Sequence, residues 1–248
     1  MKKFALILAA CATAVSARAQ LIDDFSDTSL AEYTLSKVLD QGNGTNNVSF
    51  SSPSGALLAT STGTSGAEQV LFLRGDYSLA VGYMLRADVS WAFGTSQDLG
   101  IALATTATPA SLGDLVAGDV RSDYVLAAIR GTADHVIGTG FSGTTGFNIN
   151  PQVQGGAATL GLYIARTSLT TFDIGYNKGA GDLFLRTLTV TNTAIGNAVG
   201  FYADMRADNS IGTLDNLRIE VIPEPSTLAV IGLGTVAGAA ALRRRKQG

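Results

Sequence analysis

Apolar and polar residues alternate along much of the chain, and this period of two limits the fold more than any other feature. In the stretch MLRADVSW (84–91), every second residue is apolar: Leu85, Ala87, Val89 and Trp91. Two later stretches repeat the pattern, one with Phe172, Ile174 and Tyr176 and the other with Leu217, Ile219 and Val221. Such alternation is typical of antiparallel strands that have one face in a core and the other in water. It predicts half-buried strands, with Trp91 in the core.

The rest of the region between 20 and 222 has the same character. Further strands are predicted over 67–73, 98–104, 124–130, 159–166, 182–190 and 199–205. The segments between them are rich in Gly, Ser, Thr, Asn and Asp, as turns require. Residues 170–190 are predicted to form one hairpin whose loop is NKGAGD. No fixed-period repeat is present, which disfavours a solenoid or propeller. The sequence therefore predicts an all-β, antiparallel two-sheet β-sandwich of the jelly-roll type.

Charge is distributed unevenly along the chain. Seven of the 17 basic residues lie in the termini, so residues 20–222 carry ten basic and 19 acidic residues, a net charge of −9. Phosphate backbones repel an acidic surface, which disfavours nucleic-acid binding. Cys11 is the only cysteine, so an intramolecular disulfide is impossible and the core itself must supply the stability.

The N-terminal stretch MKKFALILAACATAVSARAQ has the organisation of a secretory signal peptide. Two lysines precede a 12-residue apolar stretch, and Ala17 and Ala19 provide the small residues of a cleavage site before Gln20. Twelve residues are too few to cross a bilayer comfortably. The sequence therefore predicts a signal helix over 1–19 that a signal peptidase removes. An alternative is a lipoprotein signal, because Leu-Ala-Ala before Cys11 has the pattern of a lipobox, in which Cys11 would be acylated.

The C-terminal 26 residues combine an extended motif, an apolar segment and a basic cluster. Pro223, Glu224 and Pro225 precede a charge-free segment over 226–242, which as a helix would measure about 25 Å against a hydrocarbon core of about 30 Å. The basic cluster consists of Arg243, Arg244, Arg245 and Lys246. By the positive-inside rule the cluster stays in the cytoplasm and the body lies outside, in agreement with the signal peptide. Pro-x-Pro keeps the chain extended, which is the form in which proteases bind their substrates.

This order of elements resembles the PEP-CTERM sorting signal, found in Gram-negative bacteria that make extracellular polysaccharide. The resemblance implies recognition by an exosortase, a membrane-embedded cysteine protease or transpeptidase that cuts near the Pro-Glu-Pro. It assigns Pro223, Glu224 and Pro225 to the recognition motif, 226–242 to a transmembrane helix, and 243–246 to the topology stop. The chain would then be held transiently in the inner membrane and released to the cell envelope, the outer surface or the extracellular matrix.

The body resembles the concanavalin-A-like and laminin-G-like jelly-roll sandwiches. The resembling pieces are the opening LIDDFSD, the hairpin TFDIGYNKGAGDLFLRTLTV and the closing GFYADMRADNSIGTLDNLRIEV. In such folds the first and last strands usually pair, which would bring Asp23 or Asp24 near Asp215 and Asn216.

Few residues support a catalytic site. His135 is the only histidine, so a zinc site with two histidines is impossible, and no Gly-x-Ser-x-Gly elbow accompanies it. The body's glutamates lack the Glu-x-Asp-x-x-Glu pattern of concanavalin-like glycosidases. We therefore predict no catalytic residues and no enzyme activity.

One stretch before the last strand offers candidate ligands for calcium. Asp204, Asp208 and Asn209 lie close together before the last strand and offer hard oxygen ligands. Asp and Asn are also common in ordinary turns, which makes a solvated turn the simpler interpretation. No other cofactor is predicted.

Three functional hypotheses follow. The first is a secreted, non-enzymatic β-sandwich with a structural or adhesive role in the envelope or matrix. The second is a lectin-like module that binds the extracellular polysaccharide, with or without calcium. The third is a glycan-acting hydrolase that uses aspartates.

Overall fold

The structure is a computed structural model of the 248-residue chain, and part of that chain is described here. The described residues are 19–40, 48–61, 68–91, 98–108, 121–130, 135–143, 145–149, 159–179, 181–205 and 211–222.

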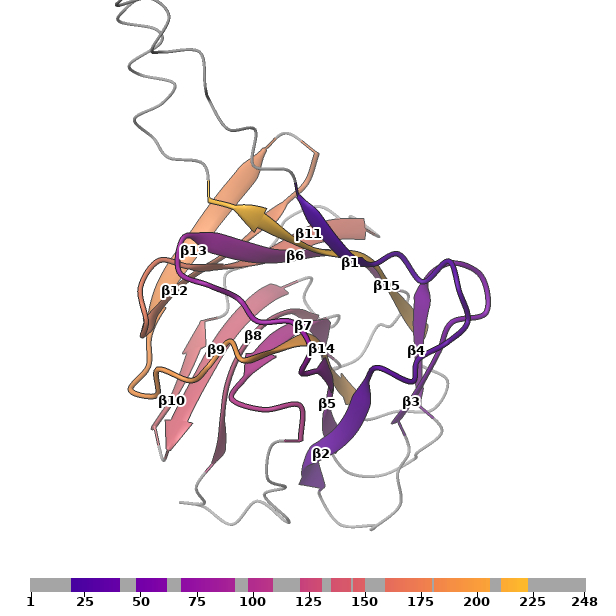
Figure 1. Cartoon of the computed structure of the whole chain (residues 1–248), viewed down its shortest axis with the longest axis horizontal. Coiled ribbons are helices and arrows are strands. Elements are labelled where there is room, and N and C mark those ends of the chain that lie inside the picture. Colours follow the sequence, from indigo (N-terminus) through magenta and orange to yellow (C-terminus); the bar gives the residue numbers. More distant parts are fainter. Residues whose placement is uncertain are drawn as a thin grey trace, which may run out of the picture.

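These residues form two antiparallel sheets stacked on one another (Figure 1). Sheet A has eight strands in the order β13-β12-β11-β6-β15-β4-β3, with β1 also paired to β15. Its strands are β1 (Gln20–Asp23), β3 (Val48–Ser51), β4 (Leu57–Ser61), β6 (Tyr83–Trp91), β11 (Thr159–Arg166), β12 (Thr171–Asn177), β13 (Asp182–Thr189) and β15 (Ile211–Val221). Sheet B has seven strands in the order β10-β9-β8-β7-β14-β5-β2. Its strands are β2 (Thr34–Asp40), β5 (Glu68–Arg74), β7 (Asp98–Ala104), β8 (Arg121–Arg130), β9 (His135–Gly143), β10 (Thr145–Ile149) and β14 (Ala198–Met205).

The predicted two-sheet β-sandwich is confirmed, and the predicted strands all appear as β5, β6, β7, β8, β11, β12, β13, β14 and β15. The hairpin over 170–190 is confirmed too, because Asn177 and Asp182 close its loop as Cα partners. The sequence analysis did not predict β2, β3, β4, β9 or β10. Strands β3, β4 and β10 are only four or five residues long, and β9 (HVIGTGFSG) contains several Gly, Ser and Thr residues that weaken the period-two pattern. In β2 (TLSKVLD) the pairing shifts register between Lys37 and Leu39, which interrupts the alternation.

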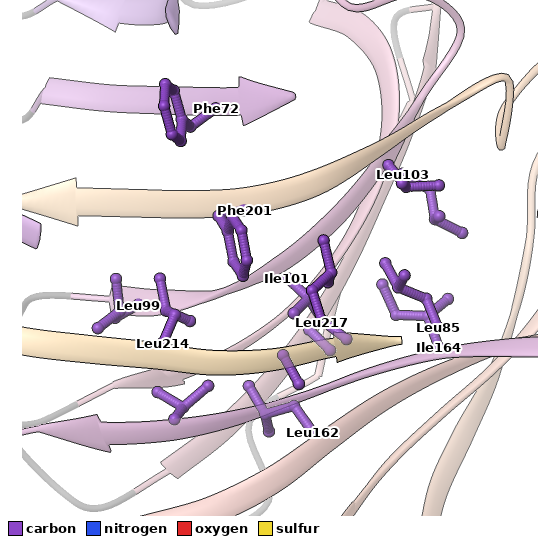
Figure 2. Close-up of a cluster of buried hydrophobic side chains, with 14 of the residues drawn as sticks. Phe72, Leu85, Leu99, Ile101, Leu103, Leu162, Ile164, Phe201, Leu214 and Leu217 are labelled. Atoms are coloured by element: carbon purple, nitrogen blue, oxygen red, sulfur yellow. The ribbon is translucent and has the colours of Figure 1, made fainter. Parts of the chain in front are cut away.

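The core lies between the two sheets. Figure 2 shows Leu99, Ile101 and Phe201 of sheet B opposite side chains of sheet A. The facing residues of sheet A include Leu85, Leu162, Ile164, Leu214 and Leu217, all fully buried. Trp91, predicted to lie in the core, is partly buried and packs against this cluster. Burial of apolar side chains from both layers supplies the main driving force for a chain that has no disulfide.

The outward side of sheet B is also buried. Its side chains form a second apolar cluster of Leu71, Leu73, Ala102, Ala104, Tyr124, Leu126, Ala128, Ala198 and Tyr202. All of these side chains are at most 3% exposed. Strand β7 is buried at every one of its seven positions. Sheet B is therefore apolar on both of its faces along much of its length.

The expected pairing of the first and last strands is confirmed. Strand β1 runs antiparallel to β15, with Gln20 opposite Ile219 and Asp23 opposite Leu217. The pairing of β15 with β6 is irregular between Asp215 and Arg218, and Asn216 adopts a positive φ of 54° there. Such a bulge shifts the alternation, so that Leu214 and Leu217 are both buried although they are three residues apart.

No helix that could span a membrane occurs in the described part of the chain. The predicted signal helix over 1–19 is outside that part, apart from Ala19. The predicted transmembrane helix over 226–242 lies wholly outside it.

Candidate functional site: the sorting junction and the outward face of sheet A

The sorting motif follows directly on the last strand of the fold. Strand β15 pairs with β6 through Val221 opposite Tyr83, and the Ile222 N–H donates a hydrogen bond of 2.9 Å to the Gly82 carbonyl. The residues immediately before Pro223 are thus fixed in sheet A. The motif itself (Pro223, Glu224, Pro225) and the basic cluster from Arg243 to Lys246 lie outside the described residues.

The predicted N-terminus of the mature chain lies beside this junction. Gln20, the residue after the predicted cleavage site, is the first residue of β1 and has Ile219 of β15 as its Cα partner. Ala17, on the other side of the cleavage site, falls outside the described residues. In Figure 1, β1 begins and β15 ends along the same upper margin of the molecule.

The outward face of sheet A carries a charge network centred on Arg86. Both terminal nitrogens of this guanidinium donate to the Asp182 carboxylate, with 2.8 Å from Nη1 to Oδ1. Its Nε lies 2.7 Å from the Glu220 carboxylate. The three partners come from β6, β13 and β15, so the network ties together three strands that are distant in the sequence. Arg86 is only 8% exposed although it lies on the predicted polar face of β6.

The network shifts the pKa values of Asp182 and Arg86. The Arg86 guanidinium hydrogen-bonded to Asp182 holds the pKa of that carboxyl below its usual value. Burial acts to lower the pKa of Arg86, but its bonds and proximity to Asp182 and Glu220 outweigh burial and raise it. Arg86 and Asp182 are therefore both charged at neutral pH, and their opposite charges compensate one another.

The ring of Tyr163 packs against the Arg86 guanidinium. The Arg86 guanidinium carbon lies 5.2 Å from the centre of the Tyr163 ring, within the range of a cation–π contact. The ring covers Gly175 on the neighbouring strand, where a Cβ atom would overlap Tyr163. Burial, followed by the negative charge of Asp182, raises the pKa of Tyr163 to about 12, so its hydroxyl stays protonated.

An open pocket of about 440 Å³ adjoins the network. Its lining includes Arg86, Asp88, Asn177, Lys178 and Arg218. Residues Thr159 to Leu162 of β11, Gly161 among them, also line it. Pockets that bind small molecules commonly have volumes of about 300–1,000 Å³. The lining offers hydrogen-bond donors and acceptors together, which suits a polar ligand.

Hydrogen bonds hold two sides of this pocket. Asn177 Nδ2 donates to Asp182 Oδ1 at 3.1 Å, and the Asn177 carboxamide oxygen accepts the Gly179 N–H. On the β15 side, Asn216 Nδ2 donates to Asp88 Oδ2 at 3.0 Å. These bonds fix the pocket's polar side chains.

Asp23 and Asp24 lie near Asp215, as expected from the pairing of the first and last strands. Burial raises the pKa of Asp215, and the nearby charges of Asp88, Asp24 and Asp23 raise it further. The Asn216 N–H donates to Asp215 Oδ1 at 2.6 Å and opposes this shift. The cluster is acidic, but in the described part of the chain no group of three or more His, Cys, Asp or Glu residues is placed to hold a metal ion.

Two aspartates face each other at one end of the outward side of sheet B. Asp98 of β7 and Asp204 of β14 are Cα partners, and both are almost fully buried, at 1% and 0% exposure. Arg130 makes two bonds of 2.7 Å to Asp98, and Gln69 donates to Asp204 at 3.1 Å. This pair does not lie in an open cleft, the setting that glycoside hydrolysis requires.

The remaining predicted site residues are only partly covered by the structure. Of the three candidate calcium ligands, Asp204 lies in β14, while Asp208 and Asn209 lie outside the described residues. The calcium site stays a prediction. His135 begins β9, and only its backbone is described. Cys11, the alternative lipidation site, is outside the described residues.

A family model described as the PEP-CTERM protein-sorting motif matches residues 221–246. The chain carries a PEP-CTERM sorting motif. This match includes the Pro-Glu-Pro, the apolar segment and the basic cluster, and it starts on Val221, the last residue of β15. The motif implies processing by an exosortase and export to the cell envelope. The sequence matches no curated protein.

Solved structures with the same fold include several enzymes that act on glycans. An endo-β-1,3-glucanase from Pyrococcus furiosus aligns over 84% of this chain and 97% of its own, with a TM-score of 0.53 and 9% identity. A GlcNAcα1-4Gal-releasing endo-β-galactosidase from Clostridium perfringens aligns over 83% of this chain and 62% of its own, with a TM-score of 0.54 and 9% identity. A functionally unknown protein from Saccharomyces cerevisiae aligns over 79% of this chain and 100% of its own, with a TM-score of 0.50 and 10% identity. These likenesses confirm the concanavalin-A-like jelly-roll fold.

The sequence analysis missed the charge network of sheet A. It placed Arg86 of β6 and Arg218 and Glu220 of β15 on polar faces but could not show that these strands are neighbours. The partners of Arg86 lie 96 and 134 residues away in the chain, and no local pattern connects them.

Proposed function

We propose that the chain is a secreted β-sandwich that an exosortase cuts near Pro223-Glu224-Pro225 and delivers to the outer surface or extracellular matrix. There the sandwich has a structural or adhesive role and no catalytic one. The observation that supports this proposal best is the position of the sorting motif. The region that matches the family model begins at Val221, the last residue of β15, and β15 pairs with β1 on one side and β6 on the other. The signal is therefore joined to the body without a linker domain.

The chemistry of the arginine-bound carboxylates supports a non-catalytic role. Asp182 and Glu220 are both bound to Arg86, and Asp98 is bound twice to Arg130. A general acid or nucleophile for glycoside hydrolysis must reach a substrate in a cleft. Carboxylates held by arginines stabilise a fold instead, and a lowered pKa, as in Asp182, is the opposite of what a general acid needs.

A second function, carbohydrate binding, is favoured by the sheet A pocket. Its lining of Arg, Asp, Asn and Lys side chains on a fixed scaffold fits the hydroxyl groups of a neutral sugar. In this version of the proposal the sorted protein binds the extracellular polysaccharide through the outward face of sheet A.

Processing is tested by mass spectrometry of the native protein after cell fractionation. We expect the recovered chain to lack the residues that follow the Pro-Glu-Pro region and to be found outside the inner membrane. A Glu224→Gln variant should keep its tail and remain in the inner membrane, because the motif's only charge is lost. Glu32→Gln, at an exposed glutamate of the body, is the matched control and should be processed normally. An intact arginine-rich tail on the wild-type protein in the inner membrane would overturn the proposal.

Carbohydrate binding is tested on a glycan array, with and without a chelator. Binding that is lost in Arg218→Ala, at the pocket, but kept in Arg186→Ala, at an exposed site on β13, would support the second function. A blank array would leave the structural or adhesive role alone. Loss of binding with the chelator would support the predicted calcium site.

A further inference from the structure

The exposed apolar side chains of the sandwich are not scattered evenly. Among the described residues, six large hydrophobic side chains are exposed. Four of them, at 40–59% exposure, lie around the end of sheet A where β1 begins and β15 ends: Leu21, Val81, Tyr83 and Leu169. The other two, Leu183 and Phe184, lie at the start of the edge strand β13. We call the first four residues the terminal patch.

Backbone contacts join the segment of Val81 and Tyr83 to the ends of β15 and β11. Tyr83 has Val221 of β15 and Arg166 of β11 as its Cα partners. The Gly82 N–H donates to the Arg166 carbonyl at 2.8 Å, and the Gly82 carbonyl accepts the Ile222 N–H. Val81 and Tyr83 therefore sit directly beside the last described residue of the chain. Leu21 lies on the other side of β15, opposite Arg218.

A buried arginine fixes the turns that carry the patch. Arg166 is 6% exposed and donates to the carbonyls of Leu79 at 2.8 Å, Thr193 at 2.6 Å and Leu169 at 3.1 Å. One side chain thus holds the segment before Val81 and the turn that carries Leu169 in fixed positions. The patch is a preorganised surface, which lowers the entropic cost of binding.

The covalent chain places a membrane-directed segment close to this surface. Only Pro223, Glu224 and Pro225 separate Ile222 from the apolar segment that begins at Ser226. Four residue steps of fully extended chain span at most about 14 Å. With the apolar segment in a bilayer, the end of sheet A that carries the terminal patch must lie near the bilayer surface.

We propose that the terminal patch rests on the outer surface of the inner membrane while the C-terminal segment is inserted, with Val81, Tyr83 and Leu169 in the headgroup region. This proposal rests on the proposed function, because it requires the C-terminal segment to enter the membrane. The contact orients the sandwich, so that the Pro-Glu-Pro is presented at a constant height above the bilayer. Aliphatic side chains with a tyrosine suit this interface, where an amphipathic ring has one end in lipid and the other in water.

The size of the patch favours a membrane over a protein partner. Four side chains exposed to about half of their surface fall far short of the roughly 800 Å² per partner that a stable protein interface buries. A body already attached to the bilayer by its tail needs only a weak contact, because the attachment supplies a high effective concentration.

The test uses the chain from 20 to 248, which contains no cysteine, reconstituted in vesicles of phosphatidylethanolamine and phosphatidylglycerol. A Leu169→Cys variant is labelled with an environment-sensitive fluorophore, and quenching by lipids that carry a nitroxide near the headgroup is measured. Phe184→Cys, at the exposed side chain on β13, is the matched control. We expect quenching to be about twofold stronger at position 169, because interfacial apolar groups enter the headgroup region by roughly 5–10 Å.

Flotation of the vesicles separates failure of this proposal from failure of the proposed function. If the protein floats with the vesicles but the two labels are quenched equally, the tail is inserted and the terminal patch does not touch the membrane. If the protein does not float, tail insertion fails, and the sorting proposal fails with it. If the fluorescence of the label at position 169 changes with protein concentration but is not quenched by nitroxide lipid, the terminal patch instead contacts a second copy of the chain.

Discussion

The outward faces of the two sheets differ sharply in chemistry. Sheet A presents charged groups, with Arg86, Asp88 and Arg218 around an open pocket. Sheet B presents leucine, alanine and tyrosine side chains that are almost completely buried. Among the described residues, the open pocket with a polar lining therefore lies on the outward face of sheet A.

The difference between the two sheets is visible in the sequences of their strands. Strand β6 of sheet A reads YMLRADVSW, with a polar residue at every second position after Leu85. Strand β7 of sheet B reads DLGIALA, an almost continuous apolar run, and it is buried throughout. Alternation indicates a strand with one solvated face, whereas a continuous apolar run is typical of a strand buried on both faces. The two kinds of strand thus distinguish the sheets before their pairing is known.

The largest effect expected from this comparison concerns two outward-facing glycines. A Cβ atom at Gly100 of β7 would overlap the Ala127 carbonyl and the Ala128 backbone, whereas at Gly161 of β11 the nearest atom would be 3.4 Å away. We expect Gly100→Ala to lower the free energy of unfolding by about 3 kcal/mol or more, because backbone atoms cannot move aside. Gly161→Ala should leave it unchanged or raise it by about 0.5 kcal/mol, because alanine is less flexible in the unfolded chain. Urea titration of both variants measures the difference, and equal losses would contradict the distinction between the faces.

A smaller effect is expected from the charge network of sheet A. Arg86→Met leaves Asp182 without its cation and leaves Glu220 paired with Arg218 alone, and we expect a loss of about 1–3 kcal/mol in the free energy of unfolding. The loss is moderate because these carboxylates are 35% and 29% exposed and regain water. Arg186→Met, at an exposed arginine on β13, is the control and should change stability by less than about 0.5 kcal/mol. A loss as large as that of Gly100→Ala would show that the network is as closely packed as sheet B.

The pH dependence of the same variant has a defined sign. The pKa of Asp182 is lower in the folded protein than in the unfolded chain. Its contribution is therefore fully present above the unfolded value, near 3.9, and is lost as the pH falls through the folded value. The stability difference between wild type and Arg86→Met should shrink over this acidic range, as measured by denaturation at several pH values.

The smallest effect is expected at Asp215, where the sign is reversed. The pKa of Asp215 in the folded protein is raised above its ordinary value, first by burial and then by neighbouring aspartates. Its charge therefore opposes folding at neutral pH, and Asp215→Asn should stabilise the protein by a few tenths of a kcal/mol, allowing for screening by solvent. The gain should vanish below the unfolded pKa, where the wild-type carboxyl is protonated in both states. A variant that is less stable than wild type at neutral pH would show that the hydrogen bond from Asn216 outweighs the repulsion.

Most of the fold could be predicted from local patterns. The charge network and the pocket of sheet A could not, because they depend on which strands pair with one another. Alternation located β6, β12 and β15 with the correct core faces, because one residue step in a strand reverses the direction of the side chain. Short or glycine-rich strands such as β3 and β9 were missed, because four residues or a run of small polar ones carry little periodic signal. The bulge at Asn216 was missed as well, and it allows both Leu214 and Leu217 to reach the core.

By itself, the sequence determined the class of the fold and the presence of a sorting signal for export. Both follow from patterns that span a few residues: alternation for the strands, and the order of Pro-Glu-Pro, apolar segment and basic cluster for sorting. Only the tertiary structure decided that Arg86 lies between Asp182 and Glu220, and that Val81, Tyr83 and Leu169 lie at the end of sheet A where β15 ends. The physical reason is sheet topology: antiparallel pairing across strands far apart in the chain creates these neighbours, and pairing depends on the packing of the whole sandwich.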